Sequence, residues 1–190
     1  MNSAALRPVH VTFVGAETGA WRIDRSSAVC GEGLPPAGRV AVHEDRDAPE
    51  CDAAAWVLRG VTSNLRYTAR SEVEALTAHQ ANGRPAATHA ALIPIRKSAA
   101  WWALAQDERR RILEEDSRHI TIGLQYLPAV ARRLLHSRDL REPFDFITWF
   151  EFSPESSAAF EELVLRLRAT EEWRYVEREV DIRLRRVEFA

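Results

Sequence analysis

The sequence is poor in cysteine and has no long apolar run. Cys30 and Cys51 are its only cysteines in 190 residues, and they form no CxxC pair or metal-ligand cluster. A single disulfide between them is one alternative, but we expect two unpaired or buried thiols in a reducing compartment. A signal-peptide pattern and an apolar run of membrane-spanning length are also missing, which predicts a cytoplasmic protein with no membrane partner.

The sequence also lacks an excess of charge of either sign. It contains 26 Lys and Arg residues against 28 Asp and Glu residues, a formal net charge of −2. Domains that bind nucleic acid usually carry a strongly basic surface, so this balance predicts no nucleic-acid partner. No GxSxG, P-loop, GxGxxG or HExxH motif occurs, so the common hydrolase, nucleotidase, dinucleotide-dependent and zinc-peptidase classes have no sequence support.

The spacing of apolar residues predicts both strands and helices. Alternation and short apolar runs predict strands at 9–14, 21–23, 39–42, 55–61, 89–97, 144–152 and 175–187. Helical periodicity predicts helices from 71 towards 82, and at 98–104, 107–116, 118–136 and 154–168.

Several details of these elements follow from turn residues and prolines. A turn ending at Gly19 suggests that the first two strands form a hairpin. We expect 39–42 to be a short edge strand within a long loop, and Pro94 predicts that 89–97 is an edge strand or a bulged one. Pro128 should kink the helix predicted over 118–136.

This order of elements predicts an α+β, ferredoxin-like fold made of two related modules. We expect one domain over residues 1–190, with an abbreviated N-terminal module at 1–85 and a C-terminal module at 86–190.

His119 is the first candidate for chemistry. It stands on an otherwise apolar helical pattern, which suits an ordinary core or surface histidine as well as a ligand. Arg132 and Arg133 lie in a similarly apolar segment, where an arginine that points inward needs an anion or a carboxylate. The sequence does not decide which of the two points inward, because Pro128 interrupts the helical phase.

Aromatic and polar side chains near predicted strand ends are further candidates. Trp101 and Trp102 are adjacent; such pairs usually give one core anchor and one surface residue, and an indole N–H can donate to a ligand carboxylate. Lys97, Asn64 and Tyr67 could join a pocket, although each taken alone is more often a surface residue.

Taken in order, these segments resemble the chlorite dismutase family. The matching segments are 95–102 (IRKSAAWW), His119, 126–134 (YLPAVARRL), 145–151 (DFITWFE) and 167–173 (LRATEEW). The resemblance covers residues 55–187, and the short chain is similar to the smaller, dimeric-type branch. It implies a dimeric α+β barrel fold, a homodimer, one heme b in each subunit, and conversion of chlorite to chloride and dioxygen.

The resemblance also implies roles for individual residues. His119 matches the proximal ligand of the heme iron, and Glu172 matches the carboxylate that accepts a hydrogen bond from it, with Glu171 as the alternative. Arg132 matches a mobile distal arginine that would attract chlorite and hold the hypochlorite-like fragment, and Arg133 takes a less constrained position. The residues that would contact the heme are Lys97, Trp101, Tyr67, Asn64, Ile93, Thr148 and Phe150.

Two other functions share these features. The related coproheme decarboxylases have the same fold and histidine but generally lack the distal arginine, so Arg132 favours chlorite chemistry. A heme-binding stress or sensor module would carry similar residues. Spacing adds a constraint, because 13 residues of straight helix would separate His119 and Arg132 by roughly 20 Å. The chain must therefore change direction near Pro128 if both face one heme.

Overall fold

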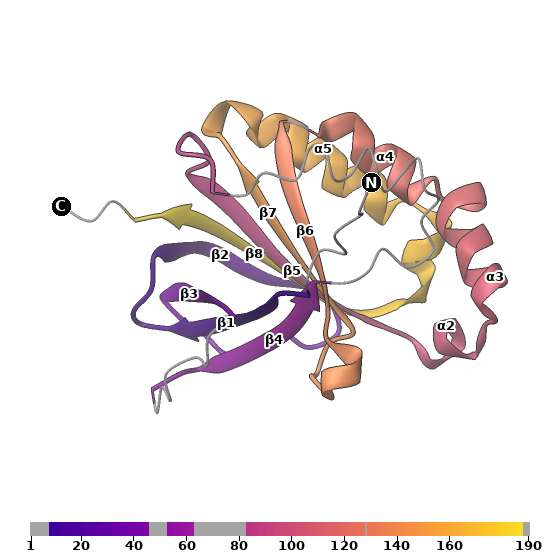
Figure 1. Ribbon diagram of the computed structural model, residues 1–190, viewed down its shortest axis with the longest axis horizontal. Coiled ribbons are helices and arrows are strands. Elements are labelled where there is room, and N and C mark those ends of the chain that lie inside the picture. The colour runs from indigo at the N-terminus through magenta and orange to yellow at the C-terminus, as the bar shows by residue number, and fades with distance from the viewer. Residues whose placement is uncertain (1–7, 46–52, 63–82, 128, 188–190) are drawn as a thin grey trace, which may run out of the picture.

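The structure is a computed structural model that describes residues 8–45, 53–62, 83–127 and 129–187 (Figure 1). Within these ranges, eight strands close into a barrel in the order β1-β3-β2-β8-β5-β7-β6-β4. The strands are β1 (His10–Ala16), β2 (Trp21–Cys30), β3 (Arg39–Glu44), β4 (Trp56–Thr62), β5 (His89–Lys97), β6 (Val130–His136), β7 (Phe146–Phe152) and β8 (Val176–Arg186). Neighbouring strands of this barrel pair in antiparallel fashion.

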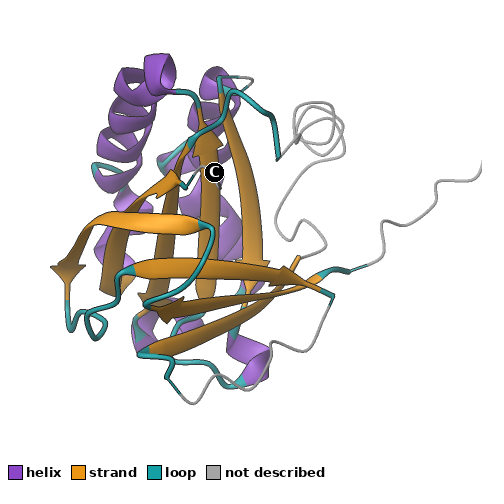
Figure 2. Cartoon of the chain, turned by 90° about the vertical axis from the view of Figure 1, so that its left-hand side faces the viewer, coloured by secondary structure: helices purple, strands orange, loops and turns teal. Residues whose placement is uncertain are grey.

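Helices join the strands of the second half of the chain. Figure 2 shows the strands in two sets that cross one another, with the helices outside them. The helical elements are α2 (Ala99–Ala103), α3 (Gln106–Arg110), the π-helical η1 (Arg111–Asp116), α4 (His119–Tyr126), α5 (Ser157–Arg168), and the 3-10 turns η2 (Arg138–Leu140), η3 (Pro154–Ser156) and η4 (Glu171–Tyr175). No helix in the described ranges has the length and apolar character needed to cross a membrane.

Strand alternation divides the apolar residues between two layers. Phe13, Leu92 and Ile182 are examples of the group that fills the interior of the barrel. Ile93 and Phe150 belong to the opposite face of the same sheet, where α4 and α5 cover it (Figure 1). Because successive strand side chains point to opposite faces, β5 and β7 supply both layers. The candidate site lies in the layer beneath the helices.

The helix predicted over 118–136 is wrong in its second half. α4 ends at Tyr126, and Val130–His136 forms β6, which pairs with β7 and with β4. A proline at position 128 lacks the N–H that would continue the helical hydrogen bonds, so the segment beyond it is free to pair as a strand. In a strand, Arg132 and Arg133 point to opposite faces, and Arg132 is the one that contacts His119.

The predicted hairpin and edge strands are also wrong. β3 lies between β1 and β2 and pairs with both, so the first two strands are not neighbours. The turn at Gly19 carries the chain past β3; its φ is +146°, and a Cβ there would lie 2.5 Å from the carbonyl of Val40. β5 pairs on both sides despite Pro94, so the edge alternative is wrong, while the alternative of a bulged strand is confirmed by a register shift between Arg96 and Lys97. Barrel closure leaves neither β3 nor β5 at an edge. The helix predicted from residue 71 lies outside the described residues.

Candidate functional site

His119 is the first residue of α4 and is 9% exposed. Arg118, directly before it, has a left-handed backbone with φ of 52°, which turns the chain sharply between η1 and α4. The carboxylate of Glu114 caps the new helix by accepting a hydrogen bond from the N–H of Ile120. The start of the helix thereby holds the imidazole between η4 on one side and β6 on the other.

Glu172, in η4, binds a histidine and a lysine with one buried carboxylate. Its Oε2 lies 2.6 Å from Nδ1 of His119, and its Oε1 accepts a hydrogen bond from Nζ of Lys97 at 2.6 Å. Its backbone N–H donates to Oγ of the buried Ser117 at 2.9 Å. A carboxylate at Nδ1 keeps the proton on that nitrogen, so the lone pair is on Nε2, the atom that can bind a metal.

The negative charge of Glu172 is stabilised by these two partners. Burial alone would raise the pKa of this carboxyl group, but the attraction of His119 and Lys97 and their hydrogen bonds hold the pKa well below its usual range. Glu172 is therefore ionised at neutral pH. Its neighbour Glu171, the alternative partner, has a side chain that is 40% exposed and pairs with Arg174 at 2.9 Å.

Arg132 reaches the same imidazole from β6. Its Nη2 lies 3.3 Å from Nε2 of His119. Its Nε is buried and has no hydrogen-bond partner among the described residues. Burial lowers the pKa of this guanidinium, and the charge of Glu172 offsets part of that effect. An unpaired buried donor is costly, so an anionic ligand near Arg132 would be stabilised.

A small apolar cavity adjoins these groups. Its volume is 30 Å³, and its lining includes His119, Arg132, Ile93, Thr148 and Phe150. This space holds about one water molecule, so a planar cofactor would fit only if the Arg132 side chain moved away from the imidazole.

The donor set suits a heme better than an ion held by protein alone. A single imidazole nitrogen with a fixed tautomer in an apolar cavity would suit a histidine that binds heme iron. Within the described ranges, no group of three or more His, Cys, Asp or Glu side chains could hold a metal ion. His119 is thus a fitting single ligand for a metal whose remaining ligands come from a macrocycle.

The other predicted residues lie at differing places around this site. The Trp101 ring is buried, 4.8 Å from Nζ of Lys97. Arg133 lies on the other face of β6 and pairs with Glu44. Asn64 and Tyr67 are outside the described residues.

Trp173 and Glu179 line the cavity and were not predicted from the sequence. The Trp173 ring lies 5.5 Å from Nζ of Lys97, and its indole N–H donates to Oε2 of Glu179 at 3.0 Å. A signal for Glu179 was available, because Glu179 and Asp181 alternate with the apolar Val180 in a strand. Such alternation places the acids on the face opposite the barrel core.

Comparison with known proteins identifies the family. The family model described as chlorite dismutase matches residues 46–186. The chain belongs to the chlorite dismutase family. Among curated proteins, the chlorite dismutase of Ideonella dechloratans is 34% identical over 125 residues. That match covers 62% of this chain and only 40% of the relative's length.

Solved structures of chlorite dismutases share the architecture. A dimeric chlorite dismutase from Nitrobacter winogradskyi is 56% identical, with a TM-score of 0.85 over 93% of this chain and 99% of the other. A mutant chlorite dismutase from Candidatus Nitrospira defluvii is 20% identical, with a TM-score of 0.66 over 94% of this chain and 91% of the other. The second likeness concerns the fold alone. The predicted family and the α+β class are confirmed.

Proposed function

We propose that this protein is a heme b-dependent chlorite dismutase that converts chlorite to chloride and dioxygen. The observation that carries the proposal is the geometry at one imidazole. Nδ1 of His119 is fixed by Glu172, Nε2 lies 3.3 Å from the guanidinium of Arg132, and both side chains line a small apolar cavity. Family membership supports the same reaction.

The residues around the cavity are suited to holding the cofactor. His119 would be its iron ligand, while Ile93, Thr148 and Phe150 would pack against the macrocycle. Heme supplies, when bound, the redox chemistry that amino-acid side chains lack. The further contacts expected from Lys97, Trp101, Asn64 and Tyr67 stay predictions.

Glu172 would act through His119. By holding the proton on Nδ1, the carboxylate raises the basicity of the imidazole and fixes the direction of Nε2. Lys97 balances the buried charge of Glu172, which lets that carboxylate stay ionised in an apolar layer.

Arg132 would bind the substrate. Its planar guanidinium carries a permanent charge and five N–H donors, which suit a small oxyanion. Moving away from His119 would free those donors, since the present contact is the 3.3 Å approach to Nε2. The same charged donors would hold a hypochlorite-like fragment in the cavity and limit its escape.

An oxygen electrode tests the proposal. Chlorite added to the purified, heme-loaded protein should release dioxygen rapidly, whereas heme bleaching without dioxygen would indicate a binding module instead. In Arg132→Ala we expect slower turnover, more escaping hypochlorite and a largely retained Soret band. Arg96→Ala is the matched control, because that arginine on β5 is exposed and pairs with the exposed Glu177 at 2.8 Å. Undiminished oxygen yield in Arg132→Ala would refute the role of Arg132.

We further infer that the barrel consists of two ferredoxin-like modules, residues 1–85 and 86–190. In the second half the strands follow the barrel order β8-β5-β7-β6, which is fourth, first, third and second in the chain. In the first half the order β4-β1-β3-β2 is the same. Only residues 17–20 connect β1 to β2, where the second half has helices, and this supports an abbreviated first module.

We also propose a homodimer, supported by the dimeric relative from Nitrobacter winogradskyi. Light scattering of the purified protein tests this, with twice the mass of the chain as the expected result. A cytoplasmic location stays a prediction from the sequence.

A further inference from the structure

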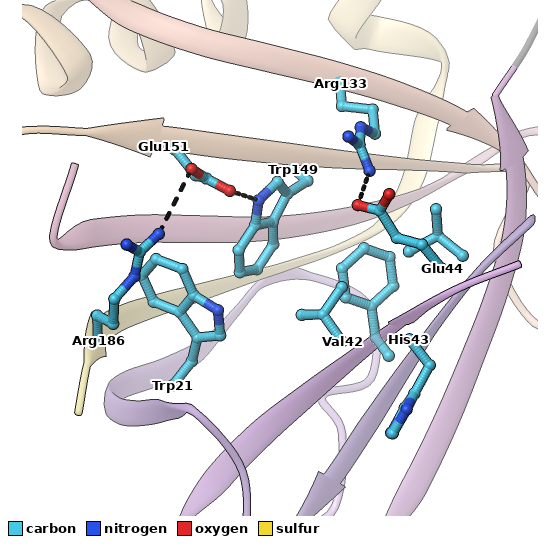
Figure 3. Close-up of a pocket in the computed structure, with 10 residues that line it drawn as sticks. Trp21, Val42, His43, Glu44, Arg133, Trp149, Glu151 and Arg186 are labelled. Carbon is cyan, nitrogen blue, oxygen red and sulfur yellow. Dashed lines mark hydrogen bonds and ion pairs between the residues drawn. The ribbon is translucent and has the colours of Figure 1, made fainter. Parts of the chain in front are cut away.

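A second and larger cavity lies at one end of the barrel interior (Figure 3). Its volume is 390 Å³, within the range of about 300–1,000 Å³ that small-molecule sites occupy. Arg133 on β6 and Trp149 on β7 line it, whereas Arg132 and Phe150, one residue away on each strand, line the His119 cavity. The two cavities therefore lie on opposite faces of the same pair of strands.

The larger cavity has an aromatic wall. The rings of Trp21 and Trp149 meet edge to face with centroids 5.2 Å apart, and Phe13 lies 5.5 Å from Trp149. All three side chains are buried and belong to the interior core of the barrel. The parts of these rings that line the cavity give it an apolar surface against which a flat apolar group can pack.

Arg186 supplies a positive charge beside that wall. Its guanidinium lies 4.8 Å from the centroid of the Trp21 ring, and its ion-pair contact with Glu151 is long, at 3.8 Å. Glu151 already accepts hydrogen bonds from Nε1 of Trp149 at 2.8 Å and from the N–H of Gly83 at 2.7 Å. Glu151 is thus satisfied by other donors, and Arg186 keeps donors for a ligand (Figure 3).

Arg133 supplies a second positive charge across the cavity. It pairs with Glu44, whose side chain is 50% exposed, while Arg133 itself is 25% exposed. Exposed ion pairs contribute little stability, so a ligand anion can replace Glu44 at small cost. Two guanidinium groups therefore flank an aromatic wall, and the acids near them are either already hydrogen-bonded or displaceable.

We propose that this end of the barrel binds a small aromatic carboxylate. The ring of such a ligand would lie against Trp21 and Trp149, and its carboxylate would pair with Arg186 or Arg133. The aromatic wall favours a flat apolar body, and the two arginines favour an anion. A ligand that uses both must therefore combine an aromatic ring with a negative charge. This inference goes beyond the proposed chlorite chemistry, which uses the other face of the sheet.

Isothermal titration calorimetry of the heme-loaded protein with benzoate tests the proposal. We expect saturable binding with a dissociation constant on the order of 1 mM or tighter. Cyclohexanecarboxylate, which has the charge without the aromatic ring, and benzylammonium, which has the ring with the opposite charge, should both bind more weakly. Benzylammonium binding as tightly as benzoate, or no saturable heat from benzoate, would overturn the proposal.

Variants locate the binding. Arg186→Gln should weaken benzoate binding about tenfold or more. Arg185→Gln is the matched control, because its side chain is 53% exposed and pairs with Asp24 on the outside of the barrel. Equal affinity in the parent protein and in Arg186→Gln would overturn the proposal.

A second variant separates this site from the heme. Benzoate is an anion that could bind iron, so the titration is repeated with His119→Ala, which alters the other cavity and is expected to lose the heme. Unchanged benzoate affinity supports the proposal whether or not the chlorite activity is found. Loss of binding in His119→Ala, or a shift of the Soret band on adding benzoate to the parent protein, would place the ligand at the heme and overturn it.

Discussion

Two groups of buried charged side chains lie close together in the layer beneath the helices. The histidine cluster consists of His119, Glu172 and Lys97. The arginine cluster consists of Arg168, Glu179, Asp181 and Arg183. Both bury carboxylates almost fully and give them cationic partners, but the partners differ in kind.

The arginine cluster ties the end of α5 to β8. Nε of Arg168 donates to Glu179 at 2.9 Å, and its Nη2 donates to Asp181 at 2.8 Å. Arg183, two residues further along β8, donates to Asp181 and to Glu161 on α5. Burial alone would raise the pKa of Asp181, but hydrogen bonds and attraction from Arg183 and Arg168 lower it. Each carboxylate there is matched by a permanent cation.

The histidine cluster is built differently, because one partner of its carboxylate, His119, has a second ring nitrogen besides the one that contacts Glu172. His119 uses Nδ1 for Glu172 and leaves Nε2 directed at Arg132 and the cavity. Arginine has no nitrogen lone pair to offer a metal, so the arginine cluster cannot do the same. We infer that the first cluster positions a ligand and the second stabilises the fold, and substitutions in each should separate these roles.

The largest expected effect is loss of the heme in His119→Ala. His119 supplies the one imidazole among the described residues that line this cavity, so we expect nearly all bound heme to be lost without it. Soret absorbance after reconstitution with heme measures it. His10→Ala, at an exposed position on β1, is the control and should bind heme as the parent does. Stoichiometric five-coordinate ferric heme in His119→Ala would contradict the assignment.

Arg168→Leu should damage stability instead. It leaves Glu179 and Asp181 buried with one cation fewer, and breaking a buried ion pair on one side typically costs about 3–5 kcal/mol. Urea unfolding measures the change. Arg174→Leu, with a side chain 77% exposed, should stay within about 0.5 kcal/mol of the parent. A stable Arg168→Leu protein that fails to bind heme would reverse the roles of the two clusters.

The sequence predicts strongly periodic elements well and long-range neighbours poorly. The strand at β7, the helix at α5 and the strand at β8 lie close to the predicted ranges, because aromatic, helical and alternating patterns there are local. The region after His119 was predicted as helix because Leu and Ala residues fit either period. Pairing of β6 with β7 and β4, which no local pattern encodes, made it a strand.

The same limit applies to the candidate site. The spacing around His119 suits an ordinary core residue as well as a ligand. Only the family resemblance predicted that His119 binds the heme iron. The face of the sheet to which Arg132 points depends on the pairing of β6 with β7, in which Arg132 lies opposite Phe150 and Arg133 lies opposite Trp149. Charges brought together across many residues, such as Lys97 and Glu172, are not visible to any local pattern. Tertiary contacts decided each of these positions.

Glu172→Gln should weaken the histidine cluster without removing it. A glutamine can still accept a hydrogen bond from Nδ1, but its neutral side chain makes the imidazole less basic, so heme affinity should fall about 10–100-fold. Heme transfer to an acceptor protein measures affinity, and a raised iron reduction potential is a second readout. Glu171→Gln is the adjacent control, since Glu171 pairs with Arg174. An equal loss in both variants would show that the contact to His119 is not the cause.

The smallest expected effect is on acid stability, where the two clusters should behave alike. The folded-state pKa is lowered for both Glu172 and Asp181, so each carboxyl group takes up a proton on unfolding in acid. Their contribution is fully present above the unfolded pKa of about 4 and is lost as pH falls towards the folded value. Each group steepens the dependence of unfolding free energy on pH by up to about 1.4 kcal/mol per pH unit.

Urea unfolding between about pH 5 and pH 3 measures this dependence. The slope of unfolding free energy against pH should be shallower in Glu172→Gln and in Asp181→Asn than in the parent protein. If the slope of unfolding free energy against pH became shallower only in Asp181→Asn, Lys97 and His119 would not be holding Glu172 ionised. That result would contradict the proposal that an ionised Glu172 fixes the imidazole of His119.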